Sequence, residues 1–162
     1  IEQSQAICEQ VFAATLDGHK LISNKSVWRN FPWIWNENWS HENMVLIGDA
    51  LHSAHFSIGS GTRLAIEDAI ALTKALEAES EIPAALARYQ AERKPIVQKL
   101  VTAARTSADW YEHFGEHMQL DLMDFAYSYI TRSGRIADAR LRAMSPEFMA
   151  RYEAEKNIGS QA

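Results

Sequence analysis

The segment from Val45 to Asp68, VLIGDALHSAHFSIGSGTRLAIED, constrains the fold more than any other part of the chain. A short apolar run ends in the pair Gly48-Asp49. A turn rich in His and Ser follows, and Gly59 to Gly61 then lead into a helical pattern. A short apolar run between turn residues is typical of a buried strand in a parallel sheet. We therefore expect a strand, a turn and a helix in this order, within an α/β fold in which helices predominate.

This order of elements suits a ligand that carries both hydroxyl groups and negative charge. At the end of a strand, Asp49 is expected at the carboxyl edge of a sheet, where open α/β folds bind ligands. Its carboxylate accepts hydrogen bonds from sugar-like hydroxyls, and Gly48 lets a ligand approach the backbone. Gly59 and Gly61 allow a tight turn whose amides, with the following helix N-terminus, attract anions. These features predict a site for a ribityl or ribose group.

The residues before this segment predict a helix and an aromatic strand. Apolar spacing predicts a helix over Glu2 to Leu16, with a stop at Asp17-Gly18. Ser26 to Trp39 is strongly aromatic and contains Pro32, which predicts an edge strand or a broken strand. Its aromatic side chains have two interpretations that the sequence leaves open, namely packing in the core or between domains, and lining a pocket for an aromatic substrate.

The residues after Gly61 predict a succession of helices. The first should end near Ala78 to Ser80, with Ala65, Ala69, Leu72 and Leu76 on its apolar face. The next starts at Ile82-Pro83, turns Leu86 and Tyr89 inward, is kinked or restarted at Pro95, and continues to about His113. The last third is expected to be helical, and Pro146 should open its final helix.

Composition excludes several classes of function. The net charge is -5 and Lys and Arg are scattered, which argues against a nucleic-acid partner. No apolar stretch is long enough to cross a membrane. The single cysteine, Cys8, is expected to be buried and inert, and it excludes a disulfide framework. This pattern favours a reducing compartment such as the cytoplasm.

Several residues near the central segment suggest other chemistry, which their context disfavours. His52 and His55 are spaced for a metal site, but we expect them to anchor the turn through hydrogen bonds, so no metal is predicted. Ser53 and Ser57 lack the G-x-S-x-G context of a hydrolase nucleophile. Arg63 has two open interpretations, an anion contact or a solvated side chain.

The rest of the chain offers no clear functional residue. The run Glu92 to Pro95 has only two basic residues beside an acidic one, so we expect a solvated helix end there, not an anion site. No residue of the chain stands out as a group for proton transfer, and the catalytic residues are unassigned.

The stretch VLIGDALHSAHFSIGSGTRLAIEDAIALTKAL resembles the Gly-Asp motif and following helix of class A FAD-dependent aromatic monooxygenases, which share the para-hydroxybenzoate hydroxylase fold. The resemblance implies that Asp49, next to Gly48, binds the ribityl chain of FAD. It also implies that the amides of Gly59, Ser60, Gly61 and Thr62 lie near N1 and O2 of the flavin ring, where they stabilise negative charge on the reduced flavin. Glu67 and Asp68 match a pair that is structural in the family.

One branch of this family is matched more closely. Phe56 stands where most members have Pro, and HFSIG-type turns occur in the branch that resembles salicylyl-CoA 5-hydroxylase and hydroxylases of CoA-linked aromatics or indoles. WRNFP, AERKP and the tail SADWYEHFGEHMQLDLMDFAYSYITRSGRI are also similar to that branch. The resemblance extends from about Val11 to Arg142.

The resemblance implies a monooxygenase that uses FAD, with NAD(P)H as reductant, to hydroxylate a small aromatic substrate. The G-x-G-x-x-G fingerprint for the ADP half of FAD does not occur here, since position 64 is Leu. We therefore expect a C-terminal part whose partner is the missing N-terminal part of the same enzyme. Residues 1–39 would end the substrate-binding region, 40–112 complete the FAD-binding domain and 113–162 form a helical extension. The alternative is a mainly helical interaction module, from a separated hydroxylase half, that no longer binds flavin.

Overall fold

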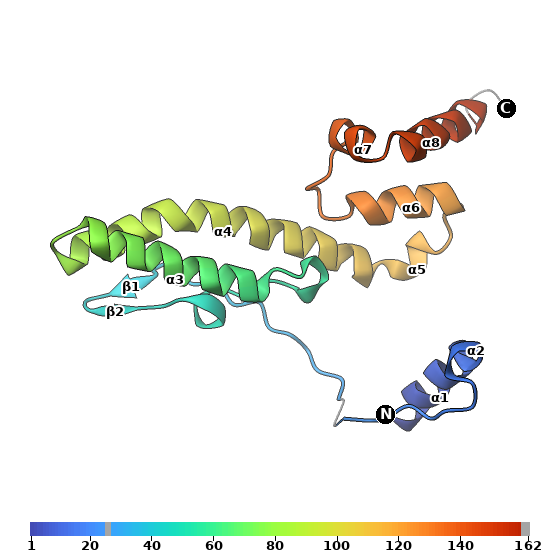
Figure 1. Ribbon diagram of the computed structural model, residues 1–162, viewed down its shortest axis with the longest axis horizontal. Coiled ribbons are helices and arrows are strands. Elements are labelled where there is room, and N and C mark those ends of the chain that lie inside the picture. Colours follow the sequence, from blue (N-terminus) through green and yellow to red (C-terminus); the bar gives the residue numbers. More distant parts are fainter. Residues whose placement is uncertain (25–26, 160–162) are drawn as a thin grey trace. The chain divides into compact units, whose positions relative to one another are not determined.

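The computed structural model describes residues 1–24 and 27–159, and helices dominate it (Figure 1). The chain forms two compact units, Ile1–Pro32 and Trp33–Ala162. The first unit holds two helices, α1 (Glu2–Val11) and α2 (Ala13–Leu16). The second unit holds β1 (Ser40–His41), β2 (Met44–Val45), the 3₁₀ turns η1 (Gly48–Ala50) and η2 (Phe56–Ile58), α3 (Gly61–Ala78), α4 (Ile82–Glu112), α5 (Phe114–His117), α6 (Leu122–Thr131), α7 (Asp138–Met144) and α8 (Pro146–Gly159).

The first unit confirms the helix predicted over Glu2 to Leu16, with one interruption. The helix is broken at Phe12, which separates α1 from α2. Asp17 then takes a left-handed conformation with φ of 46°, and Gly18 follows with φ of 81°, so the predicted stop is confirmed. Cys8 is only partly buried, not fully buried as predicted.

The strand predictions were wrong in both places. The Met44–Ile47 run forms only the short β2, which pairs antiparallel with β1 in the register Ser40–Val45. The polar turn between them closes a hairpin, with Glu42 at φ of 52°, and the structure describes no strand parallel to β2. In the aromatic segment, Ser26 lies outside the described residues, and the described part forms a single bridge between Trp35 and His52.

Two long helices, α3 and α4, pack along each other and carry the core of the second unit (Figure 1). Their predicted limits are confirmed, because α3 ends at Ala78 and α4 runs from Ile82 to Glu112. The predicted inner face of α3 is confirmed only in part. Leu72 packs against the core, but Leu76 is 46% exposed, and the fully buried residues are Leu64, Asp68 and Ala75. The buried face of α3 therefore lies to one side of the predicted apolar face, and it includes the charged side chain of Asp68.

Trp39 is the aromatic centre of this core. It is fully buried, its ring centroid lies 5.3 Å from that of Tyr89, and its backbone N–H donates to Oε1 of Gln90 at 2.8 Å. Burial raises the pKa of the Tyr89 phenol, whose hydroxyl reaches the carbonyl of Leu46 at 3.5 Å. Of the two interpretations of the aromatic segment, core packing therefore holds for Trp39, whereas Trp33 is 44% exposed. The remaining members of the cluster are Leu51, Leu64, Ala75, Val97 and Val101.

The segment around Pro95 departs from expectation. The helix α4 continues through Pro95 without a restart, and Pro95 itself is exposed. The prediction of a solvated helix end was also wrong, because Arg93 is only 5% exposed. The helix is held on both sides of the proline by buried residues, among them Tyr89 and Val97, and their packing offsets the hydrogen bond that a proline removes.

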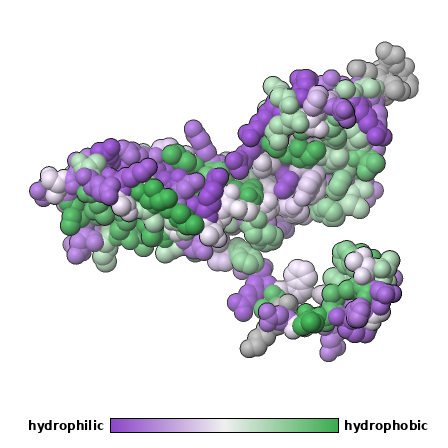
Figure 2. Space-filling model, in the orientation of Figure 1, coloured by the Kyte–Doolittle hydropathy of each residue, from purple (hydrophilic) through white to green (hydrophobic). Residues whose placement is uncertain are grey.

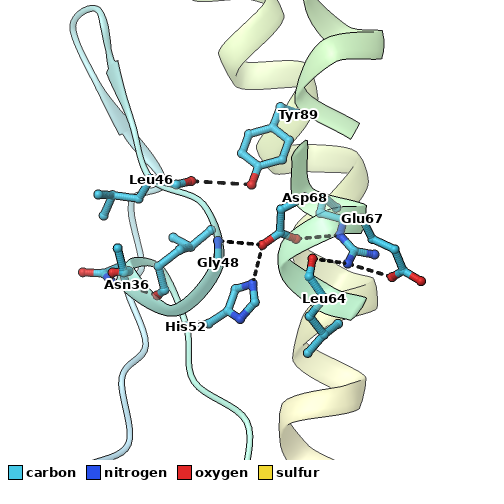
Figure 3. Close-up of polar contacts among 11 residues, drawn as sticks. Asn36, Leu46, Gly48, His52, Leu64, Glu67, Asp68 and Tyr89 are labelled. Carbon is cyan, nitrogen blue, oxygen red and sulfur yellow. Dashed lines mark hydrogen bonds and ion pairs between the residues drawn. The ribbon is translucent and has the colours of Figure 1, made fainter. Parts of the chain in front are cut away.

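Arg93 is buried because it pairs with the carboxylate of Asp68, which is also fully buried. The Nε atom of Arg93 donates to Oδ1 of Asp68 at 2.8 Å, and an Nη atom lies 2.8 Å from Oε2 of Glu67. The other oxygen of Asp68 accepts from the backbone N–H of Gly48 at 3.0 Å and from Nε2 of His52 at 2.8 Å (Figure 3). An ionised carboxylate can only accept hydrogen bonds, so all three contacts stabilise the charged form.

These contacts decide the ionisation of Asp68. Burial alone would raise the pKa of this carboxyl, but the hydrogen bonds from His52, Arg93 and Gly48 outweigh burial and lower the pKa below its ordinary value. Asp68 therefore joins three parts of the chain as an anion: α3, which carries it, α4 through Arg93, and the loop at η1 through Gly48 and His52.

The C-terminal helices have a separate aromatic cluster. Trp110, near the end of α4, is 6% exposed and stacks on His117 with ring centroids 4.5 Å apart. Phe114, Phe125 and Tyr129 also surround its ring. The prediction that Pro146 opens the final helix is confirmed by α8. In the part of the chain that is described, no helix is both long and apolar enough to span a membrane.

Replacing Arg93 by Met should lower the free energy of unfolding by about 3–5 kcal/mol, because Asp68 would remain buried without its cation. Chemical denaturation of purified protein measures this. Arg88→Met is the matched control, since Arg88 lies on the same helix and also pairs with two carboxylates, those of Glu79 and Glu92, but at the surface. We expect a much smaller loss there, and equal losses in the two variants would contradict the role of burial.

The lowered pKa of Asp68 predicts a pH dependence of stability. Because the pKa is lower in the folded state, the contribution is fully present above the unfolded value of about 3.9 and is lost as the pH falls through the folded value. The difference in unfolding free energy between wild type and Asp68→Asn should therefore shrink as the pH is lowered below about 4. Urea titrations at several pH values measure this difference, and a difference that stays constant with pH would refute the assignment.

Candidate functional site

The loop at η1 is shaped by Gly48, the first residue of the predicted Gly-Asp pair. Gly48 has φ of +60°, a conformation that side chains disfavour, and a Cβ there would lie 3.1 Å from Cβ of Ala65. Its N–H is used by Asp68 and is buried. Glycine is therefore needed here to let the loop pack on α3, and its amide is not free for a ligand.

Asp49 follows immediately and is placed differently. It is exposed, and within the described part of the chain no group donates a hydrogen bond to its carboxylate. The backbone on either side is fixed, because Gly48 is bound to Asp68 and the N–H of Leu51 donates to the carbonyl of Gly48 at 2.9 Å. An unpaired carboxylate on a fixed loop is ready to accept hydrogen bonds from the hydroxyl groups of a ligand.

The histidine-rich turn is held by the two histidines, as predicted. His52 is buried against Asp68, and its N–H donates to the carbonyl of Gly48 at 3.0 Å. Nδ1 of His55 accepts from the N–H of Ser57 at 3.2 Å and so caps η2. The ring of His55 lies on Phe56 and stacks on Trp33, with centroids 4.2 and 6.1 Å apart. Both histidines are thus engaged in holding the turn.

The N-terminus of α3 follows this turn and has free amides. Gly59 takes a left-handed conformation with φ of 60° and ends η2. Ser60 precedes the helix, but its hydroxyl donates to the carbonyl of Ile58 at 3.2 Å, so no side chain caps the first turn. The amides that begin at Gly61, with the partial positive charge of an 18-residue helix, have the chemistry to hold an anion. Thr62 is exposed at the same end.

The glycine at the start of α3 has no explanation in the packing of this chain. A Cβ on Gly61 would meet nothing within 4 Å, and its φ is ordinary. The same open space surrounds Gly59. Open space beside uncapped amides fits a flat ligand that lies against the helix N-terminus.

The η1 loop, which carries Asp49, packs against α3. Gly48 packs on Ala65, one helical turn beyond Gly61, so the loop that carries Asp49 lies against the N-terminal part of α3. Arg63 is 56% exposed and lies 3.4 Å from Oε1 of Glu67, which favours its interpretation as a solvated side chain. Glu67 and Asp68 are structural, as the family resemblance implied.

Sequence reasoning missed Arg93, the cation that holds this arrangement. A signal for it existed, because Tyr89, Arg93, Val97 and Val101 are spaced by four residues and form one buried stripe on α4. A charged residue in the middle of such a stripe indicates a buried partner.

The residues present fit FAD. The exposed carboxylate of Asp49 suits the ribityl hydroxyls, and the uncapped amides at Gly61 and Thr62 suit the electron-rich edge of the flavin ring. The helix N-terminus would stabilise negative charge that appears on the ring when it is reduced. Within the described residues, no group of three or more His, Cys, Asp or Glu side chains is arranged to hold a metal.

Comparison with known proteins agrees with this fit. The sequence model of the FAD-binding domain family matches residues 5–104. The chain is 43% identical to salicyloyl-CoA 5-hydroxylase of a Streptomyces species, over 82% of this chain and 26% of that protein. It is 43% identical to 3-hydroxy-4-methyl-anthranilyl-[aryl-carrier protein] 5-monooxygenase of Streptosporangium sibiricum, over 82% and 37%. It is 38% identical to protodeoxyviolaceinate monooxygenase of Chromobacterium violaceum, over 90% and 37%.

The chain thus spans about a quarter to somewhat over a third of the length of these relatives. The family match covers more than half of the chain and includes the η1 loop, the η2 turn and both long helices up to residue 104. The exposed Asp49, the uncapped N-terminus of α3 and the matched family lead to one conclusion. The chain belongs to the class A FAD-dependent aromatic monooxygenases, whose cofactor is FAD.

Proposed function

We propose that this chain forms the ribityl and ring side of the FAD site in an NAD(P)H-dependent aromatic monooxygenase. The observation that carries the proposal is the free carboxylate of Asp49 beside the uncapped N-terminus of α3. In this proposal, Asp49 binds ribityl hydroxyls, and the amides of Gly59, Ser60, Gly61 and Thr62 face the flavin ring. Gly48 contributes by placing Asp49, since its own amide is bound to Asp68.

When bound, FAD supplies the transfer of electrons from NAD(P)H to oxygen and the hydroxylation of the aromatic ring. The chain supplies position and charge. The first turn of α3 favours a ring that carries negative charge, and the fixed η1 loop orients the ribityl chain relative to it. No residue of this chain is assigned to proton transfer.

The exposed apolar surface supports a role as part of a larger domain. Met44, Leu46 and Ile47 near β2 are 39 to 61% exposed, as are Ile66 and Ile70 on α3 at 56 and 49%. Figure 2 shows apolar side chains in green at the surface over this part of the second unit. Contiguous apolar surface indicates contact with further protein. We propose that residues 40–112 complete an FAD-binding domain with an N-terminal part, that residues 1–39 end a substrate-binding region, and that 113–162 form a helical extension.

The names of the relatives support a proposal for the substrate class. Salicyloyl-CoA and an anthranilyl group on an aryl-carrier protein are both aromatic acyl groups held on a carrier. We propose an aromatic substrate of this carrier-linked type, with an indole-type ring as the other class in the matched branch. Trp33 and Phe56 are exposed at the η2 turn, which precedes the N-terminus of α3, and they support an aromatic pocket there. The alternative, an interaction module without flavin, leaves the free carboxylate and uncapped amides unexplained.

A flavin titration tests the proposed function. FAD added to the complete gene product should bind with a stoichiometry of one and with changes in flavin absorbance and fluorescence, and NAD(P)H should reduce it faster when a carrier-linked aromatic substrate is present. A complete gene product that binds no flavin would overturn the proposal in favour of the interaction module.

Asp49→Ala in the complete protein should weaken FAD binding by about tenfold to a hundredfold, because about 1.5–3 kcal/mol of charge-assisted hydrogen bonding would be lost. Stability should change little, since the carboxylate is exposed and makes no bond within the described chain. Glu77→Ala, which removes an equally exposed carboxylate from α3, is the control and should leave FAD affinity unchanged. Equal affinities for wild type and Asp49→Ala would refute the assigned contact.

Gly61→Ala should separate ligand binding from folding. The added methyl group meets no protein atom, so stability should be unchanged or rise by about 0.4–1 kcal/mol, whereas FAD affinity should fall because the ligand faces this position. Gly115→Ala is the matched control, because Gly115 is also helical and open but lies in α5. Calorimetry and FAD titration measure both properties, and unchanged FAD affinity in Gly61→Ala would place the ligand elsewhere.

A further inference from the structure

Arg132, the residue that follows α6, contacts the segment from Phe56 to Thr62, here called the flavin-side turn. One terminal nitrogen of its guanidinium donates to the carbonyl of Ser57 in η2 at 3.3 Å, although 75 residues separate the two in sequence. The other terminal nitrogen donates to the carbonyl of Tyr129 at 2.7 Å. The guanidinium therefore ties the end of α6 to the middle of η2, two residues before Gly59.

The guanidinium is held in place by aromatic rings. It lies over Tyr129 at 4.2 Å from the ring centroid and over Tyr111 at 5.7 Å. Such stacking fixes the plane of a guanidinium and shields it partly from water. Tyr111 lies at the end of α4 and Tyr129 on α6, so two helices orient the group that contacts η2.

The positive charge of Arg132 has no acidic partner in the structure as described. The ion pairs that other arginines make, such as Arg93 with Asp68 or Arg142 with Glu153, have no counterpart here. Its two terminal nitrogens donate to carbonyl groups, which carry no net charge. A half-buried cation that no carboxylate neutralises attracts a nearby negative charge, although solvent screens part of the attraction.

Two polar atoms at this contact are left without hydrogen bonds. Nε of Arg132 and the hydroxyl of Ser57 are both buried and have no partner within the described residues. Each such group costs about 1–3 kcal/mol when it is buried unpaired. The contact is therefore poorly explained by the stability of the turn alone, and buried unpaired groups of this kind call for a functional explanation.

We propose that Arg132 is a positioning residue that fixes the flavin-side turn through Ser57 and whose unpaired charge favours the reduced form of the bound flavin. This inference rests on the proposed function, because it assumes that the amides from Gly59 to Thr62 face the ring. Reduction by NAD(P)H adds two electrons and one proton to the flavin and leaves one negative charge on the ring. The N-terminus of α3 and the guanidinium of Arg132 would then both stabilise that negative charge, at opposite ends of the flavin-side turn.

The size of the effect follows from Coulomb's law. At an assumed separation of about 10 Å between the guanidinium and the reduced ring, and an effective dielectric constant near 20, removal of one charge changes an equilibrium constant by roughly tenfold. Reduced FAD should therefore lose about ten times more affinity than oxidised FAD when the charge is removed. For a two-electron couple, this tenfold change corresponds to a midpoint potential about 30 mV more negative.

The test uses the complete, FAD-loaded protein and four variants. Arg132→Met removes both the charge and the hydrogen bonds. Arg132→Lys keeps the charge but loses the two terminal nitrogens that donate to Tyr129 and Ser57. Arg132→Gln keeps a hydrogen-bond donor without the charge. Arg135→Met removes a charge three residues further on, from a side chain that makes no contact with Ser57. The measurements are the midpoint potential of the flavin and the hydrogen exchange of the amides from Ser57 to Thr62 in the apoprotein.

We expect the potential to fall by about 30 mV in Arg132→Met and Arg132→Gln, and to stay near the wild-type value in Arg132→Lys and Arg135→Met. Amide exchange in the turn should accelerate in Arg132→Met and Arg132→Lys. An unchanged potential in both neutral variants, or an equal shift in Arg135→Met, would overturn the charge role. Unchanged exchange in Arg132→Met would overturn the positioning role. If Arg132→Met does not fold, Arg132→Gln and Arg132→Lys still decide both points. Wild-type protein that binds no FAD would instead refute the proposed function.

Discussion

The buried carboxylate of Asp68 is the contact on which the rest of the second unit depends. It receives a backbone N–H from Gly48, a ring N–H from His52 and the guanidinium of Arg93 (Figure 3). A single anion therefore joins both long helices to the η1 loop. The loop in turn carries Asp49, so the fully buried side chain of Asp68 fixes the position of this exposed carboxylate.

A charged centre in a core of this size has a physical consequence. Burying an ion pair contributes little net stability compared with apolar packing, but removing one partner is strongly destabilising. The three hydrogen bonds to Asp68 also come from fixed directions, so only one placement of Gly48 satisfies them all. The network thus specifies where the loop lies, while Trp39, Tyr89, Leu51 and Leu64 supply the apolar burial. The site is assembled from a rigid support with its exposed groups left free.

Much of this arrangement could be predicted from the sequence, and the errors have identifiable causes. Helix limits at Ala78, Ile82 and Pro146 follow from local rules of capping and proline placement, and these predictions were confirmed. The strand predicted at Met44–Ile47 failed because a parallel strand requires neighbours, and the described residues offer it only a hairpin partner. The apolar face of α3 was misplaced because apolar periodicity ignores a buried charge. Asp68 lies at the centre of the true inward face, and its partner Arg93 is 25 residues away in sequence.

For the candidate site, too, the sequence identified the local motifs but not the long-range contacts. The Gly-Asp pair and the glycines before α3 were identified from local chemistry and from the family resemblance. The packing distinguishes two of these glycines. Gly48 is needed where the loop packs on Ala65, whereas a side chain at Gly61 would meet no protein atom. The contact between Arg132 and Ser57 joins segments 75 residues apart, and no local pattern indicates it.

We propose that Asp68 fixes the η1 loop and that Asp49, which this loop carries, contacts the cofactor. A crystal structure of the complete protein with FAD bound tests this most directly. We expect the carboxylate of Asp49 to lie within hydrogen-bond distance of ribityl hydroxyls, while Asp68 remains bonded to Gly48, His52 and Arg93 and does not touch the cofactor. A structure in which FAD avoids Asp49, or in which Asp68 leaves its partners to contact the flavin, would contradict it.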